Sequence, residues 1–243
     1  MPPPGKSARF DPRPAARALA EAWRDGATLP ALAEGTAPQS LSQGRRVARA
    51  MLAELDLPAV GFRALASGLA GPLLAPRLAR SGSLIPRAAL PGLEASAACL
   101  FPLCRKLPPL AAPYSLRRVL GALGPARAAI DLAAWRTEAG PRSTAAQLAD
   151  LCGLGIVVVA DPPRGAAGAD PRALRIACDD SSPVILDVTP LLVAAAESAR
   201  LSGGLPEGAA LVAVGLVPAG TPPAGTTLAV RITGAGRASA TLV

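Results

Sequence analysis

The stretch LEASAACLF, residues 93–101, combines small and apolar residues with a single charged one, a composition typical of a buried strand. Side chains alternate between the two faces of a strand, so Glu94 and Ser96 would lie side by side on one face. Two carboxylates at this spacing would make a compact pair of oxygen ligands for a hard divalent cation. The sequence has Glu-x-Ser instead. The strand therefore carries either part of a metal site or one ordinary charged residue.

The composition limits the kind of core that the chain can form. Hydrophobic residues make up 51% of the 243 residues but aromatic residues only 2%, so the core must consist of Leu, Val and Ala. No charge-free run of about 18 apolar residues occurs, and the opening segment, MPPPGKSARFDPRPAARA, lacks the apolar stretch of a secretory signal. We therefore expect no membrane-spanning segment, no membrane partner and a cytoplasmic protein.

The residue types that are present limit the chemistry. The chain has no histidine, and its four cysteines form no Cys-x-x-Cys pair. Cys/His zinc sites, Ser-His and Cys-His nucleophile pairs and histidine general bases are thereby excluded. Isolated cysteines in apolar segments are typical small core residues. Carboxylates, Arg, Lys, hydroxyls, thiols and one Tyr remain able to carry chemistry.

The basic residues are spread along the chain. There are 25 Lys and Arg against 17 Asp and Glu, which gives a net charge of +8. The local clusters GRRVAR (44–49) and SLRRVL (115–120) contain no aromatic residue, whereas nucleic-acid sites combine clustered basic residues with stacking aromatic ones. We interpret the charge as compositional bias and expect no nucleic-acid partner, while anionic small molecules remain candidate ligands.

Periodicity and turn residues predict helices that come early and strands that come mostly later. Helices are expected at residues 14–26, 40–55, 115–123, 143–151 and 189–204. Strands are expected at residues 57–63, 93–101, 127–134, 154–160, 173–179, 183–188, 209–217, 226–233 and 238–243. This order favours an α+β fold over alternating βαβ units. Residues 1–13 are predicted to form a disordered Pro-rich tail and residues 14–243 a single domain.

Four segments carry a resemblance to a known family. They are LPAVGFRALAS (57–67), LEASAACLFPLCRKLPP (93–109), ARAAIDLAAWR (126–136) and EGAALVAVGLVPAG (207–220). In order and spacing they resemble the 2-keto-4-pentenoate hydratases and oxalocrotonate decarboxylases of the fumarylacetoacetate hydrolase superfamily. The resemblance extends from about residue 14 to the C-terminus. It implies N-terminal helices packed on a mixed, roll-like β-sandwich.

The resemblance also implies a metal site. In the family, Mg²⁺ or Mn²⁺ is held by three carboxylates, chelates a 2-oxo acid and stabilises its enolate as a Lewis acid. The positions that match are Glu94, Ser96 and Asp131. The second carboxylate is therefore replaced by a hydroxyl and the third is one methylene shorter, so any Mg²⁺ or Mn²⁺ would be weakly bound.

The substrate-binding positions have changed as well. The family's lysine matches Arg63, whose planar fork differs from a lysine's point charge. The resemblance assigns Arg63 and Ser67 to substrate binding. The two hydroxyl residues of a late loop match Val214 and Leu216, so both hydroxyls are lost. No catalytic residue is assigned.

Asp131 lies in the apolar run AAIDLAAW, so its carboxylate must be paired, exposed or functional. Arg63 is therefore either its ion-pair partner or a clamp for the substrate. The sequence leaves both alternatives open.

Losses at both the metal and the substrate positions favour a hydratase-like protein that is not catalytic. It would bind a small carboxylate or 2-oxo acid, or act as a subunit beside an active partner, as a homo-oligomer or a hetero-oligomer with an active homologue. The alternative is a divalent-metal-dependent hydro-lyase or decarboxylase of 2-oxo acids that uses Glu94 and Asp131, with Arg63 on the substrate. A third hypothesis is a structural protein whose apolar strand edges pair with a partner.

Overall fold

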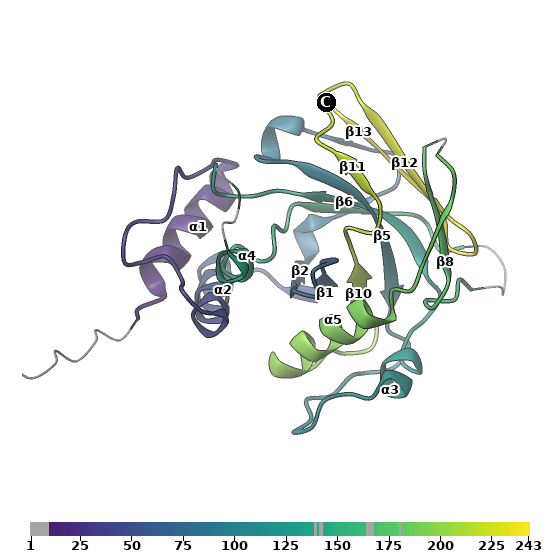
Figure 1. The fold of residues 1–243 in the computed structure, drawn as a ribbon, viewed down its shortest axis with the longest axis horizontal. Helices are drawn as coiled ribbons and strands as arrows, with labels where there is room; N and C mark the ends of the chain where they lie inside the picture. Colours follow the sequence, from purple (N-terminus) through teal and green to yellow (C-terminus); the bar gives the residue numbers. More distant parts are fainter. Residues whose placement is uncertain (1–9, 139, 141–142, 164–167, 180) are drawn as a thin grey trace, which may run out of the picture.

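A layer of helices covers one side of the molecule. The structure, a computed structural model, describes residues 10–138, 140, 143–163, 168–179 and 181–243. The layer consists of α1 (Arg13–Asp25), α2 (Leu41–Leu55) and the short α4 (Thr144–Ala149), which lie together at the left of Figure 1. Two further helices, α3 (Leu116–Leu120) and α5 (Thr189–Leu201), lie below the sheets in that view. No helix within the described ranges is long and apolar enough to cross a bilayer.

Two mixed β-sheets form the rest of the domain. The large sheet has the order β2 (Ala70–Leu74), β1 (Ala59–Ala64), β10 (Ala210–Ala213), β5 (Glu94–Pro102), β6 (Arg127–Ala133), β7 (Ile156–Val159) and β3 (Leu78–Arg80), with β11 (Pro218–Gly220) also paired to β5. The small sheet has the order β4 (Ser83–Ile85), β13 (Gly236–Leu242), β12 (Thr227–Ile232), β8 (Leu174–Cys178) and β9 (Val184–Leu186). Parallel and antiparallel pairs occur in both sheets.

The large sheet is buried on both faces, which explains why its strands read as nearly continuous apolar runs. On one face, alternate residues of β5 such as Ala97 and Cys99 pack against the small sheet and α5. On the other face, the intervening residues Ala98 and Leu100 pack against α1, α2 and α4. Because side chains alternate along a strand, β5 supplies both cores at once. It also borders β10, β6 and β11, and so lies at the centre of the fold.

The α+β class and the mixed β-sandwich are confirmed, and every predicted helix and strand has a counterpart with shifted ends. The strands β2, β3, β4 and β11 were not predicted. The strand β2 contains Pro72, and the other three strands have only three residues each, so none shows a usable alternation. Most of the predicted disordered tail, residues 1–9, lies outside the described residues.

The contact between α2 and α4 depends on one glycine and yields a prediction. A Cβ built on Gly44 would lie 2.4 Å from the backbone oxygen of Ala145. In a helix interior, alanine is normally more stable than glycine by about 1 kcal/mol. We nevertheless expect Gly44→Ala to lower the free energy of unfolding by about 1–3 kcal/mol, because the added methyl overpacks the interface. Urea denaturation measures the change, with Ser42→Ala, at an exposed position of α2, as control. A Gly44→Ala protein more stable than the parent would contradict this packing.

Candidate functional site

The central strand β5 and its neighbour β6 bring three of the predicted site residues together. Ser96 and Asp131 are direct partners in the antiparallel register of these strands, and Glu94 lies two residues from Ser96. All three positions share the sheet face of Ala98 and Ala129, which is the face covered by the helices. The juxtaposition of Glu94, Ser96 and Asp131 that the sequence predicted is therefore present.

A buried ion pair joins Arg63 to Asp131. The Arg63 Nη2 donates to Asp131 Oδ2 at 2.7 Å, and the two side chains are 0% and 3% exposed. The Arg63 Nη1 donates to the carbonyl oxygen of Cys152 at 2.6 Å. Of the two alternatives that the sequence left open, the structure has the ion pair. The assignment of Arg63 to a substrate remains a prediction, which would require this pair to open.

The ion pair depends on the geometry of the large sheet. Arg63 lies on β1 and Asp131 on β6, and the sheet order puts both β10 and β5 between these strands. Only the twist and curl of the sheet bring the two side chains within contact. Sequence alone gives no register between strands that are not neighbours, so it could suggest this pair but not establish it.

A tight turn after α4 supplies the carbonyl that Arg63 binds. Leu151 and Cys152 have positive φ angles of 49° and 57°, which is uncommon for residues other than glycine, and Gly153 follows at 67°. The turn lies against β2 because the facing residue, Gly71, has no side chain; a Cβ there would be 2.9 Å from the Leu151 oxygen. Gly71 is also the register partner of Arg63. The glycine thus allows the turn to present its carbonyl to the guanidinium.

A second buried ion pair lies on the other side of this turn. Arg136 Nη1 is 3.2 Å from Asp150 Oδ1, and the backbone N–H of Arg136 donates to Asp150 Oδ2 at 2.9 Å. The guanidinium also donates to the carbonyl oxygens of Ala134 and Leu154. Sequence reasoning missed this pair, since Asp150 comes from the end of α4 and nothing local links it to Arg136. The two pairs together hold the turn and the ends of β6 in place.

The remaining predicted residues lie at the edge of this site. Glu94 is exposed, and its Oε2 accepts a hydrogen bond from Trp135 Nε1 at 3.2 Å. Ser96 is nearly buried, and its Oγ accepts from the backbone N–H of Gly215 at 3.1 Å. Ser67 lies in the exposed turn between β1 and β2. Glu94 and Ser67 thus face solvent, whereas Ser96 lies beside Asp131 within the sheet.

The late loop around Gly215 carries apolar side chains. Val214 is fully buried in the core that faces the helices, and Leu216 packs against the other core. The loop still contributes polar backbone groups: Gly215 binds Ser96, and the N–H of Leu216 donates to the Ala97 oxygen at 3.0 Å. Its function in this chain is therefore to fix β5 from one side.

The electrostatics of Asp131 are set by burial and by its neighbours. Burial raises the pKa of Asp131, the Arg63 guanidinium lowers it through charge and hydrogen bonding, and the Glu94 carboxylate raises it. Burial also raises the pKa of the Cys152 thiol to about 12, so this thiol is not a nucleophile at neutral pH. Burial is the largest of these effects, so the pKa of Asp131 lies above its ordinary value and the contact with Arg63 opposes the rise.

The donor atoms of the site fit a divalent metal poorly. Glu94 Oε2 accepts from Trp135, Ser96 Oγ from Gly215 and Asp131 Oδ2 from Arg63. Asp131 Oδ1 is buried without a hydrogen-bond partner among the described residues. One orphan oxygen beside a guanidinium does not provide the several anionic oxygens that Mg²⁺ or Mn²⁺ requires. Nor do the described residues contain a group of three or more His, Cys, Asp or Glu that could hold a metal.

The comparisons with known proteins concern the fold. No family model matches the chain, and no curated protein matches its sequence. Two structures of 4-oxalocrotonate decarboxylase from Pseudomonas putida G7 are similar at 15% identity. The match with the structure complexed with calcium and acetate covers 98% of this chain and 99% of the decarboxylase chain, with a TM-score of 0.76. The match with the structure complexed with magnesium and adipate covers 94% of this chain and 96% of the decarboxylase chain, with a TM-score of 0.75.

A third structure resembles part of the chain. Fumarylpyruvate hydrolase from Pseudomonas aeruginosa, in complex with Mn²⁺ and pyruvate, covers 77% of this chain and 91% of its own, with 12% identity and a TM-score of 0.52. The chain thus has the fold seen in 4-oxalocrotonate decarboxylase over almost its full length, and shares part of it with fumarylpyruvate hydrolase. The predicted resemblance is confirmed for the fold.

The buried ion pair yields a prediction on stability. We expect Asp131→Asn to lower the free energy of unfolding by about 3–5 kcal/mol, since it leaves the Arg63 charge uncompensated in the core. The double variant Arg63→Met/Asp131→Leu removes both charges and should be destabilised less than Asp131→Asn. Chemical denaturation of the set measures this coupling.

The matched control is Glu197→Gln, which breaks the partly exposed pair between Arg200 and Glu197 on α5, whose side chains are 11% and 32% exposed. It should cost less than about 1 kcal/mol, because exposed pairs contribute little. An equal decrease in the free energy of unfolding for Asp131→Asn and Glu197→Gln would show that the buried pair stabilises the fold no more than the partly exposed one.

Proposed function

We propose that this protein uses a decarboxylase-like fold for a non-catalytic function. The observation that carries the proposal is the buried contact between Arg63 and Asp131. The similar decarboxylase structures are complexed with magnesium or calcium, whereas in this chain a guanidinium is the cation beside Asp131. An internal cation of this kind makes a metal at the same carboxylate unfavourable, because the two positive charges would repel each other at short range.

The function that remains is binding. We propose that the chain binds a small carboxylate or 2-oxo acid at the rim near Glu94 and Ser67, or acts as a subunit beside an active partner. The ligand class is supported by the acetate and adipate complexes of the similar decarboxylase and by the pyruvate complex of the hydrolase. A carboxylate ligand would have to use backbone N–H groups and hydroxyls, because Arg63 is buried and occupied.

The subunit role is supported by the edges of the small sheet. The edge strands β4 and β9 carry Leu84 and Ile185, whose side chains are 67% and 65% exposed. Unpaired edge strands with exposed apolar residues are suited to pairing with another chain. We therefore propose a homo-oligomer, or a hetero-oligomer with an active homologue, assembled through one of these edges.

A metal-dependent hydro-lyase or decarboxylase of 2-oxo acids is the second candidate. It is favoured by one observation. Asp131 Oδ1 is buried and lacks a hydrogen-bond partner among the described residues, and Asp131 lies on the same face of the large sheet as Glu94. If Arg63 withdrew, Glu94, Ser96 and Asp131 would supply the predicted metal donors. This candidate requires the ion pair to be weak enough for a metal to displace.

A metal titration distinguishes the two candidates. We expect calorimetry with Mn²⁺ to show no saturable binding below about 1 mM, since the carboxylate shell is incomplete and neutralised. The variants Glu94→Ala and Asp131→Asn should leave this result unchanged. Saturable binding in the parent that both variants abolish, together with turnover of a 2-oxo acid, would instead establish the enzyme and overturn our proposal.

The inverse experiment restores the ligand set. We expect the triple variant Arg63→Lys/Ser96→Glu/Asp131→Glu to gain Mn²⁺ binding, because it provides three carboxylates and replaces the fork that occupies Asp131. An increase in affinity of at least about tenfold over the parent corresponds to the gain of one good anionic ligand. The control is Ser96→Glu alone, which keeps the ion pair and should gain less. Binding as tight in this control would show that the ion pair does not oppose the metal.

A further inference from the structure

A second hollow lies at the opposite end of the central strand from Glu94. Its cavity volume is about 510 Å³, and it is lined by Arg105, Lys106, Leu107, Ser115, Arg117, Arg118, Gly121 and Ala122. Arg105 and Lys106 follow the C-terminal end of β5, and Arg117 and Arg118 belong to α3. The basic cleft is distinct from the ion-pair site, because none of its lining residues takes part in either buried ion pair.

Four cations converge in the basic cleft. Arg105, Lys106, Arg117 and Arg118 are all exposed, and no Asp or Glu is among the lining residues. Within the described part of the chain, none of these four side chains makes a hydrogen bond or an ion pair. The sequence suggested scattered charge, but the fold joins two dipeptides about ten residues apart. Such an uncompensated cluster repels itself and is stabilised by a bound anion.

One of the cations is held by an aromatic neighbour. The Arg118 guanidinium lies 5.8 Å from the ring centroid of Tyr114, whose hydroxyl donates to the carbonyl oxygen of Pro108. A cation over an aromatic face is held by the ring quadrupole while its N–H groups stay available. The Tyr114 ring is itself buried against the core, so it gives Arg118 a fixed support.

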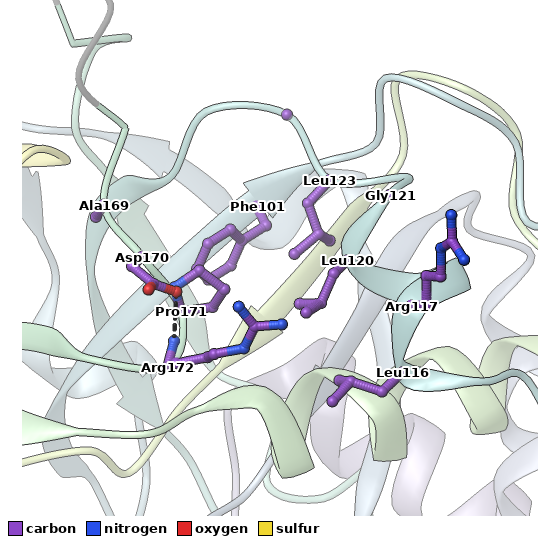
Figure 2. Close-up of a pocket in the computed structure, with 11 residues that line it drawn as sticks. Phe101, Leu116, Arg117, Leu120, Gly121, Leu123, Ala169, Asp170, Pro171 and Arg172 are labelled. Carbon is purple, nitrogen blue, oxygen red and sulfur yellow. Dashed lines mark hydrogen bonds between the residues drawn. The ribbon is translucent and has the colours of Figure 1, made fainter.

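An apolar hollow adjoins the basic cleft across α3. It has a cavity volume of about 740 Å³, shares Arg117 and Gly121 with the cleft, and is lined mainly by apolar residues together with Asp170 and Arg172. Figure 2 shows Leu120 and Leu123 pointing toward Phe101, with Arg172 reaching in from the opposite wall. The charged and apolar hollows together suit a molecule with a strongly anionic end and a less polar body.

We propose that the basic cleft binds the phosphate groups of an organic polyphosphate, whose organic part lies in the apolar hollow. Arginine forks bind phosphate oxygens in pairs, and four cations match an ion that carries several negative charges better than a single carboxylate. The site lies outside the ion-pair region and does not depend on the function proposed there. It would make this chain responsive to a ligand of a different class from the small carboxylates.

The test compares two probes that share the same anionic group. Calorimetry at low ionic strength with inorganic triphosphate should give one saturable site, and ATP without metal should bind more tightly because its nucleoside contacts the apolar hollow. We expect Arg117→Ala/Arg118→Ala to weaken triphosphate binding by at least about tenfold, since two charge-assisted contacts are lost. Thermal unfolding would confirm that this exposed double variant still folds.

The control has the same change of charge on another helix. Arg45→Ala/Arg49→Ala removes two exposed arginines from α2 and should leave triphosphate binding unchanged. An equal loss in this control, or no saturable binding of triphosphate up to about 10 mM, would overturn the site. Hexaglutamate that binds as tightly as triphosphate would replace the phosphate ligand by an acidic peptide. ATP that binds no tighter than triphosphate would overturn the role of the apolar hollow.

Discussion

The contact between Arg63 and Asp131 is the interaction on which the arrangement of the site depends. Two charges taken from water into a core are costly unless each finds its partner, and here the partners come from β1 and β6, with β10 and β5 between them. The curl of the sheet, the close approach at Gly71 and the left-handed turn at Cys152 all converge on the guanidinium. The pair therefore ties the sheet to the loop that follows α4.

This ion pair changes the chemistry that the fold can support. The decarboxylase with the same fold is complexed with a divalent cation in its solved structures, whereas here a covalently attached cation neutralises Asp131. Glu94 and Ser96 keep their places on the strand but are engaged by Trp135 and Gly215. One oxygen of each of the three side chains thus has a partner within the protein, while Asp131 Oδ1 has none among the described residues. The ion pair is thus buried, while Glu94 beside it stays exposed to solvent.

The sequence was informative where the relevant contacts are local. Strand alternation predicted that Glu94 and Ser96 share a face, and the apolar run around Asp131 indicated a carboxylate that is paired, exposed or functional, of which the structure has the buried pair. The pair Arg136–Asp150 and the basic cleft were missed because their members come together only through the tertiary fold. Short edge strands such as β3 and β4 were missed because three residues carry no periodicity. Local patterns thus predicted elements and faces, while contacts across the sheet required the structure.

We propose that the Arg63 guanidinium takes the place of a metal ion beside Asp131. Crystals of the protein soaked in Mn²⁺ and measured at a wavelength sensitive to manganese test it most directly. We predict no anomalous peak at a metal–oxygen distance of about 2.2 Å from the Asp131 carboxylate. We also predict that the contact between Arg63 and Asp131 stays intact. A manganese peak bound by Asp131 and Glu94, with the Arg63 side chain displaced, would contradict it.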